Sequence, residues 1–155
     1  MRALLVLFLT LPLLGADPRK QLIGTWRLVS YERTTPAGIT ESPFGKTPAG
    51  RLIYDGKGRM STHMMRPGRP SFSEPQLRNG TPAEIEAAYR GYLAYWGTFT
   101  VNSTEKVILH RIEGSLYPNW VGSEQRRPFS FEKGRLVLIS DSSLGRARIV
   151  WEKLP

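Results

Sequence analysis

The chain has 155 residues, of which 40% are hydrophobic and 23% charged. This length and balance fit one globular domain and exclude wholesale disorder. The chain contains no cysteine, which excludes disulfides, thiolate catalysis and cysteine-ligated metal sites. Fifteen Gly and 12 Pro predict many turns and short elements instead of long helices.

The first sixteen residues have the pattern of a secretory signal peptide. Arg2 precedes an almost wholly apolar run, Leu4 to Leu14, and Gly15-Ala16 supply the small residues of a cleavage site. We therefore expect residues 1–16 to be removed before Asp17 and the protein to be exported, to a periplasm or to the cell exterior. The apolar run is shorter than the roughly 20 residues that span a bilayer, so a retained membrane anchor is the weaker alternative.

Residues 17–155 form a single domain, and most of it is predicted to be β-structure. Short stretches with alternating polarity are separated by turns such as Asp55-Gly56-Lys57-Gly58 and Glu132-Lys133-Gly134. Tight turns between successive strands favour an antiparallel meander or barrel over βαβ winding. In the first strand, alternation predicts Trp26, Leu28 and Ser30 on one face and Tyr31 on the other. The predicted strands cover residues 23–33, 51–54, 59–65, 96–101, 106–116, 124–131, 135–140 and 146–153, with a weak additional strand near 38–40.

One segment has helical spacing instead. Thr81-Pro82-Ala83-Glu84 combines a capping hydroxyl, a proline at the first helical position and a glutamate three residues after the cap. The spacing predicts an amphipathic helix over 81–96, preceded by a proline-containing loop over 66–80. We expect this loop and helix to cover one end of the β-domain, close to residues 117–120. The predicted apolar face of the helix consists of Ile85, Ala88, Tyr89, Tyr92, Leu93 and Trp96.

The sequence offers few groups for catalysis. His63 and His110 are the only histidines, and they lack the spacing of a metal-binding pair on a helix. There is no nucleophile elbow, phosphate-binding loop or dinucleotide glycine motif. Glu113 shares a strand with His110 but falls on its opposite face. We therefore predict no catalytic residue, no metal and no cofactor.

The positive charge allows several partners. Loss of residues 1–16 would remove Arg2 and no acid, which changes the net charge from +9 to +8. Such a charge attracts nucleic acid, acidic lipid headgroups or an anionic small molecule. The chain has no nucleic-acid-binding module and carries an export signal, so nucleic acid is not an expected partner. A solvated basic surface is the simplest interpretation, and no oligomeric state is predicted.

Several segments together resemble the lipocalin-like domain family. The Gly24-Thr25-Trp26 start is similar to the opening of lipocalins. The resemblance continues through residues 48–55, 58–61, 65–67, 91–99, 113–125 and 150–154, and so covers about 21–154. It implies an all-β fold, an antiparallel up-and-down barrel of about eight strands with one inserted α-helix. The resemblance carries no catalytic signature.

A barrel of eight strands is either filled by side chains or holds one small ligand. We expect Trp26 to close one end of it. Arg127 faces inward by alternation, and a buried guanidinium requires a carboxylate, which a ligand can supply. The candidate ligand-binding residues are Tyr54, His63, Met65, Tyr95, His110, Tyr117, Asn119, Trp120, Gln125 and Arg127.

Three functions remain open from the sequence. The favoured one is the binding of a small, partly hydrophobic molecule with an acidic group inside the barrel. The second is an isomerase or cyclase that uses His63 or His110 as acid–base. The third is a structural or envelope-interacting protein with a filled barrel.

Overall fold

The computed structural model describes residues 17–76 and 79–155. The predicted signal peptide, residues 1–16, lies outside the described residues. Within these described ranges, the elements are a short helix, α1 (Pro18–Leu22), followed by nine strands, a second helix and a short 3₁₀ helix. No helix among the described residues is long and apolar enough to cross a membrane.

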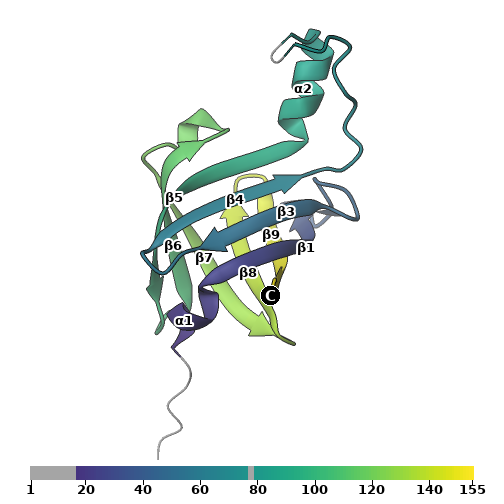
Figure 1. Cartoon of the computed structure of the whole chain (residues 1–155). Coiled ribbons are helices and arrows are strands. Elements are labelled where there is room, and N and C mark those ends of the chain that lie inside the picture. Colours follow the sequence, from purple (N-terminus) through teal and green to yellow (C-terminus); the bar gives the residue numbers. More distant parts are fainter. Residues whose placement is uncertain (1–16, 77–78) are drawn as a thin grey trace, which may run out of the picture.

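Eight of the strands close into an antiparallel barrel (Figure 1). Successive strands pair with one another, and β1 pairs with β9 to complete the ring, while the short β2 adds to the edge of β1. The predicted all-β, up-and-down barrel is therefore confirmed. Its strands are β1 (Gly24–Thr34), β2 (Thr40–Glu41), β3 (Ala49–Tyr54), β4 (Arg59–Met65), β5 (Tyr92–Asn102), β6 (Val107–Ser115), β7 (Glu124–Glu132), β8 (Arg135–Ser142) and β9 (Gly145–Lys153).

A bulge in β1 changes which side chains face the interior. The register with β9 shifts between Leu28, which pairs with Trp151, and Ser30, which pairs with Val150. An extra residue in one strand reverses the alternation beyond it. Tyr31 therefore packs against the core, and the centre of its ring lies 5.1 Å from the centre of the Phe44 ring. The prediction that Ser30 shares the inner face with Trp26, and that Tyr31 lies opposite, is wrong for this reason.

The inserted helix is shorter than predicted and stands apart from the barrel. Helix α2 (Pro82–Arg90) begins with the expected capping box, in which Thr81 and Glu84 exchange hydrogen bonds. It ends at Gly91, and the predicted last residues of its apolar face, Tyr92, Leu93 and Trp96, belong to β5 instead. Aromatic residues favour strands, and pairing with β4 buries Tyr95 and packs the partly buried Leu93 against the core from the alternate position.

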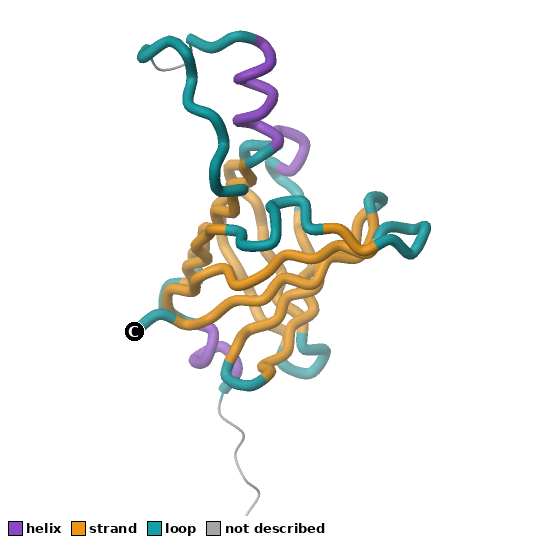
Figure 2. The backbone as a smooth tube through the Cα atoms, turned by 90° about the vertical axis from the view of Figure 1, so that its right-hand side faces the viewer, coloured by secondary structure: helices purple, strands orange, loops and turns teal. Residues whose placement is uncertain are grey.

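None of the residues of α2 is buried, and Ile85 and Tyr89 are 48% and 46% exposed. In two views at right angles, the helix and its preceding loop project beyond the barrel (Figures 1 and 2). The prediction that they cover the barrel end together with residues 117–120 is therefore wrong. We call the segment from Arg66 to Arg90 the projecting arm.

The end of the barrel beside α1 is closed by Trp26. The indole is 2% exposed, and its Nε1 donates to the carbonyl of Leu22 at 2.8 Å. Leu22 is itself fully buried, and the Lys153 ammonium lies 5.2 Å from the centre of the Trp26 ring. The hydrogen bond and the shared burial hold α1 under the barrel.

Replacing Trp26 with alanine removes this plug. We expect Trp26→Ala to lower the free energy of unfolding by about 3–5 kcal/mol, the usual cost of truncating a buried aromatic side chain. Urea denaturation followed by circular dichroism measures the change. Trp96→Ala is the matched control, because Trp96 is 55% exposed on the outer face, and it should cost about 1 kcal/mol or less. Equal losses in the two variants would contradict the role given to Trp26.

Candidate functional site

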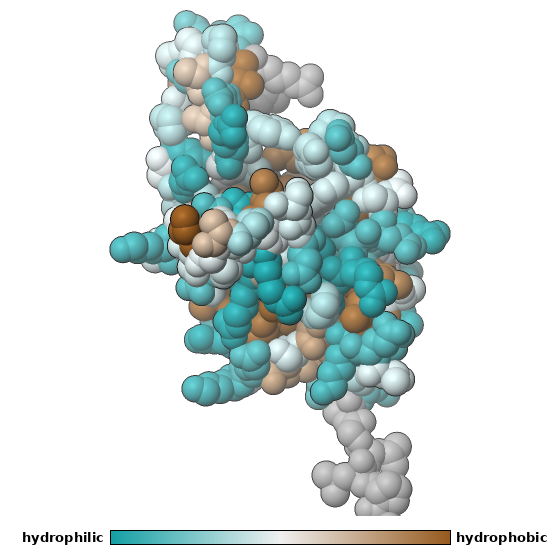
Figure 3. Space-filling model, turned by 180° about the vertical axis from the view of Figure 1, so that it is seen from behind, coloured by the Kyte–Doolittle hydropathy of each residue, from teal (hydrophilic) through white to brown (hydrophobic). Residues whose placement is uncertain are grey.

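Polar side chains inside the barrel lie among apolar ones. Strand alternation directs one set of residues inward, and most of these form a single core of aliphatic and aromatic side chains. The face of the molecule seen in Figure 3 is mainly polar, with hydrophobic residues in small separate patches. In the part of the chain that the structure describes, three polar or charged residues are buried, namely Thr62 on β4, His110 on β6 and Arg127 on β7. They define the candidate site.

His110 is held between two tyrosines from neighbouring strands. Its Nε2 lies 2.7 Å from the hydroxyl of Tyr54 on β3, and its Nδ1 lies 3.1 Å from the hydroxyl of Tyr95 on β5. A neutral imidazole has one donor and one acceptor nitrogen, so one tyrosine donates to the ring and the other accepts from it. All three side chains are 5% exposed or less. The network satisfies these buried polar groups and joins three strands.

Burial sets the protonation state of this network. Desolvation lowers the pKa of His110 well below its ordinary value, and the positive charge of Arg127 lowers it further. Desolvation also raises the pKa of Tyr54 well above its ordinary value, against the opposing effect of Arg127. The imidazole and the phenol of Tyr54 are therefore both neutral at physiological pH. With both nitrogens engaged, His110 cannot take a proton from a substrate unless a tyrosine moves away.

Arg127 is the most unusual residue of the interior. It is 4% exposed, and guanidinium groups remain protonated in proteins. Its Nη1 donates to the carbonyl of Arg126 at 2.9 Å, and its Nη2 lies 3.5 Å from the amide oxygen of Gln125. Among the described residues, 17–76 and 79–155, none of the ion pairs includes Arg127. The inward position predicted for Arg127 is confirmed, and the carboxylate it requires is not supplied by the described residues.

Two buried side chains on other strands have donors without hydrogen-bond acceptors. The hydroxyl of Thr62 and the indole Nε1 of Trp151 have no hydrogen-bond partner among the described residues. A buried polar group without a partner typically costs about 1–3 kcal/mol. Together with Arg127, these groups make the interior rich in donors, and a ligand with oxygen acceptors would satisfy them.

Aromatic residues line the barrel end opposite α1. The 3₁₀ helix η1 (Pro118–Trp120) joins β6 to β7 there. The ring of Trp120 lies edge to face with those of Tyr95 and Tyr117, and the distances between ring centres are 5.6 and 5.8 Å. Asn119 is exposed on the same turn. The predicted residues Tyr95, Tyr117 and Trp120 therefore come together, and Tyr95 links them to His110.

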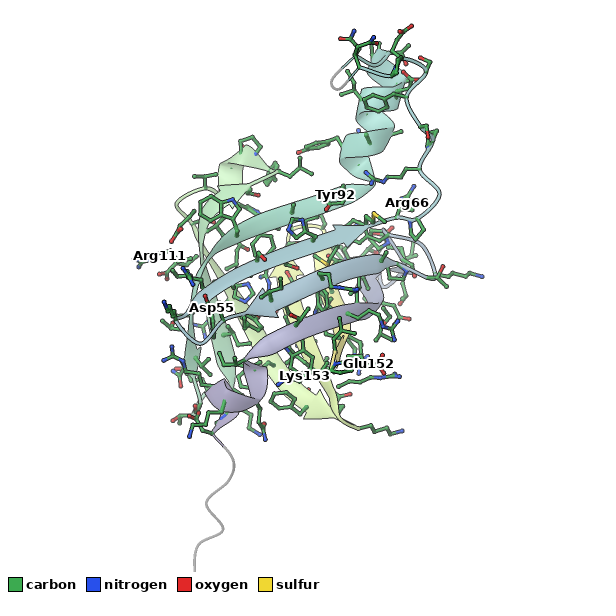
Figure 4. All side chains as sticks on the ribbon, viewed as in Figure 1. Asp55, Arg66, Tyr92, Arg111, Glu152 and Lys153 are labelled. Atoms are coloured by element: carbon green, nitrogen blue, oxygen red, sulfur yellow. The ribbon has the colours of Figure 1, made fainter. Side chains whose placement is uncertain are left out.

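Two predicted site residues lie elsewhere. His63 and Met65 are on the outer face of β4, because Met60, Thr62 and Met64 take the inward positions. Placing them in the barrel interior was wrong, since strand alternation from Arg59 directs them to solvent. They line a shallow outer hollow of about 210 Å³ together with Tyr92, whose hydroxyl lies 3.0 Å from His63 Nδ1. Tyr92 lies near the base of the projecting arm (Figure 4).

Sequence reasoning missed three interior residues. Tyr31 enters the cluster only through the bulge, which no sequence pattern indicated. The pKa of Tyr31 is raised, because the effect of burial exceeds the opposing effects of the charges of Arg33 and Arg127. Thr62 and Trp151 could have been found from alternation, because Thr62 lies between the inward methionines Met60 and Met64.

Comparisons with known proteins found the following similarities. A family model described as a lipocalin-like domain matches residues 23–154. The 4'-hydroxy-3'-methoxypropiophenone carrier protein ppsC of Aspergillus oryzae is 39% identical, and the match covers 62% of this chain and 97% of that protein. Two crystal structures of mutants of the fluorescent protein UnaG align with a TM-score of 0.42. Their identities are 12% and 14%, over 86% and 88% of this chain and 96% and 98% of theirs.

The neutral state of His110 predicts a pH dependence of stability. Because its pKa is lower in the folded than in the unfolded chain, the unfolded chain binds the proton first as the pH falls. Stability is therefore full above the unfolded pKa of about 6.5 and is lost as the pH falls below it. We expect the free energy of unfolding to drop by about 1 kcal/mol between pH 7 and pH 5.5.

Urea denaturation of His110→Gln across the same range provides the test, since this variant should show a flatter profile. His63→Gln retains His110 and should keep the slope. A profile for His110→Gln as steep as that of the unsubstituted protein would assign the slope to other groups.

Proposed function

Because the chain belongs to the lipocalin-like domain family, we propose that it binds a small, partly hydrophobic molecule with an acidic group inside its barrel. The observation that carries this proposal is the buried guanidinium of Arg127, which no carboxylate of the described residues neutralises. A ligand with an apolar body and an acidic oxygen would bury its body against the core and its oxygen against Arg127.

The aromatic residues at the barrel end opposite α1 support an aromatic ligand. Trp120 contacts both Tyr95 and Tyr117 edge to face, and flat rings pack well against such a surface. The curated relative is named as a carrier of 4'-hydroxy-3'-methoxypropiophenone. That name describes one aromatic ring with a hydroxyl, a methoxy group and a ketone. This combination of an apolar ring with oxygen acceptors fits the donors Arg127, Thr62 and Trp151.

A binding role accounts for the interior better than catalysis does. His110, the histidine nearest to the site, has both ring nitrogens occupied by tyrosine hydroxyls. His63, the other histidine considered as an acid–base, is outside the barrel. A filled structural barrel would have no reason to retain a buried cation without a partner, because an apolar residue of similar size would be more stable there.

Removing the buried charge tests the proposal. We expect Arg127→Leu to weaken binding of 4'-hydroxy-3'-methoxypropiophenone by about ten- to a hundredfold, because a hydrogen bond to a charged group contributes about 1.5–3 kcal/mol. Titrations followed by tryptophan fluorescence measure the affinity, since Trp120 lies at the barrel opening.

Arg126→Leu is the matched control. Arg126 is the preceding residue on β7, but its side chain is 63% exposed and pairs with Glu105 at 3.1 Å on the outer face. It should leave the affinity unchanged. The proposed site would be refuted by equal effects of the two substitutions, or by no saturable binding of this ligand and a panel of hydrophobic acids.

We also propose that the protein is exported. The support is the charged and apolar N-terminal segment, together with the position of Asp17, whose side chain accepts from the backbone N–H of Arg19 and caps α1. Helix α1 thus begins directly after the proposed cleavage site. Expression of the whole chain followed by N-terminal sequencing of the exported protein should yield Asp17 as the first residue. Material that keeps Met1 would contradict cleavage.

A further inference from the structure

The positive charge of Arg127 has no counter-ion inside the barrel. The buried polar and charged side chains are Thr62, His110 and Arg127, so the described interior contains no buried acid. A buried charge is costly unless it is paired. The carboxylate of Glu41 on β2 raises the pKa of Tyr31, but this carboxylate is already ion-paired with Arg33.

The other titratable groups around Arg127 cannot supply the missing negative charge. They are Tyr31 on β1, Tyr54 on β3 and His110 on β6, and the charge of Arg127 acts on the pKa of each of them. Burial raises the pKa of Tyr31 and of Tyr54, so these phenols stay protonated. His110 is neutral because burial lowers its pKa. The compensating charge must therefore arrive with the ligand.

Resting on the ligand site proposed above, we infer that the barrel holds a hydroxyaryl ligand as its phenolate, with the phenolate oxygen against the Arg127 guanidinium. The O–H bond of the ligand breaks on binding, the electron pair stays on oxygen, and the proton leaves to solvent. A neutral phenol would leave the guanidinium buried without an opposite charge. A phenolate converts it into a buried ion pair, and an opposite charge at contact distance lowers the pKa of an acid by about 1–3 units.

The unpaired donors define the rest of the ligand. Thr62 Oγ1 and Trp151 Nε1 are buried without acceptors, and both belong to the inner face of the barrel. They require oxygen acceptors elsewhere on the ligand, such as a ketone or an ether. The ligand class is therefore a small phenol that carries further oxygen acceptors on an otherwise apolar aryl body.

The charge state of the bound ligand can be observed directly. A phenolate conjugated to a ketone absorbs at longer wavelength than the phenol. We expect 4'-hydroxy-3'-methoxypropiophenone, at a pH one unit below its own pKa, to change from about one tenth ionised in solution to mostly ionised when bound. Calorimetric titration in two buffers of different ionisation enthalpy should show close to one proton released per ligand.

A matched ligand and matched variants isolate the cause. The O-methyl ether of the same ligand has no proton to lose, so its affinity should not vary between pH 6 and pH 8. The affinity for the phenol should fall by up to about tenfold per pH unit below its solution pKa. Arg126→Leu should retain the spectral shift, Arg127→Leu should lose it, and Arg127→Lys, which keeps a positive charge, should retain part of it.

The outcomes separate this inference from the binding function on which it rests. Saturable binding of the phenol to the unsubstituted protein, without a spectral shift or proton release, would overturn the phenolate and leave the binding function standing. Absence of any saturable binding would overturn both. If Arg127→Leu fails to fold, the spectrum and the proton count of the unsubstituted protein still decide the question.

Discussion

The closing pairing between β1 and β9 is the contact on which the rest of the molecule depends. It joins the first and last strands of the domain over nearly the whole length of β1. Without it, the other strands would form an open sheet with two free edges and no enclosed interior. β1 also pairs with β3 along its other edge, so β1 is hydrogen-bonded to β9 on one side and to β3 on the other. The bulge within it turns Tyr31 into the enclosed space.

Closure explains why a few polar residues have such strong effects. In an open sheet, Arg127 and His110 would lie near water and keep ordinary charge states. Inside the ring, water is excluded, which makes the imidazole neutral and leaves the guanidinium without solvation. The tyrosine–histidine network satisfies its own hydrogen bonds, whereas Thr62 and Trp151 have no partner among the described residues, and Arg127 has hydrogen bonds but no opposite charge there. This difference separates the groups that stabilise the barrel from the groups that would hold a ligand.

Much of the fold was predictable from local signals. Turns with glycines, alternation in the strands and the Gly24-Thr25-Trp26 start were sufficient for an up-and-down barrel. The same alternation correctly placed Arg127 inside and Glu113 outside. The errors arose where two periodicities compete. Residues 92–96 satisfy both a helical and a strand pattern, and only pairing with β4 decides between them.

The candidate site was predictable only in part, for related reasons. The rim residues Tyr117 and Trp120 could be inferred because Pro118 interrupts strand pairing. The inward position of Tyr31 depends on a single extra residue in β1, which leaves no trace in the sequence. His63 and Met65 were assigned to the interior as members of one strand face, but the inner face of β4 is the opposite one, which carries Thr62.

The projecting arm divides the chain into two halves that meet only through the barrel. β1 to β4 precede it and β5 to β9 follow it, and the two sets are joined by the seven register pairs between β4 and β5 and by the seam between β1 and β9. The arm buries none of its helix in either set. A protease that cut the arm would therefore leave two fragments held along both of these ladders.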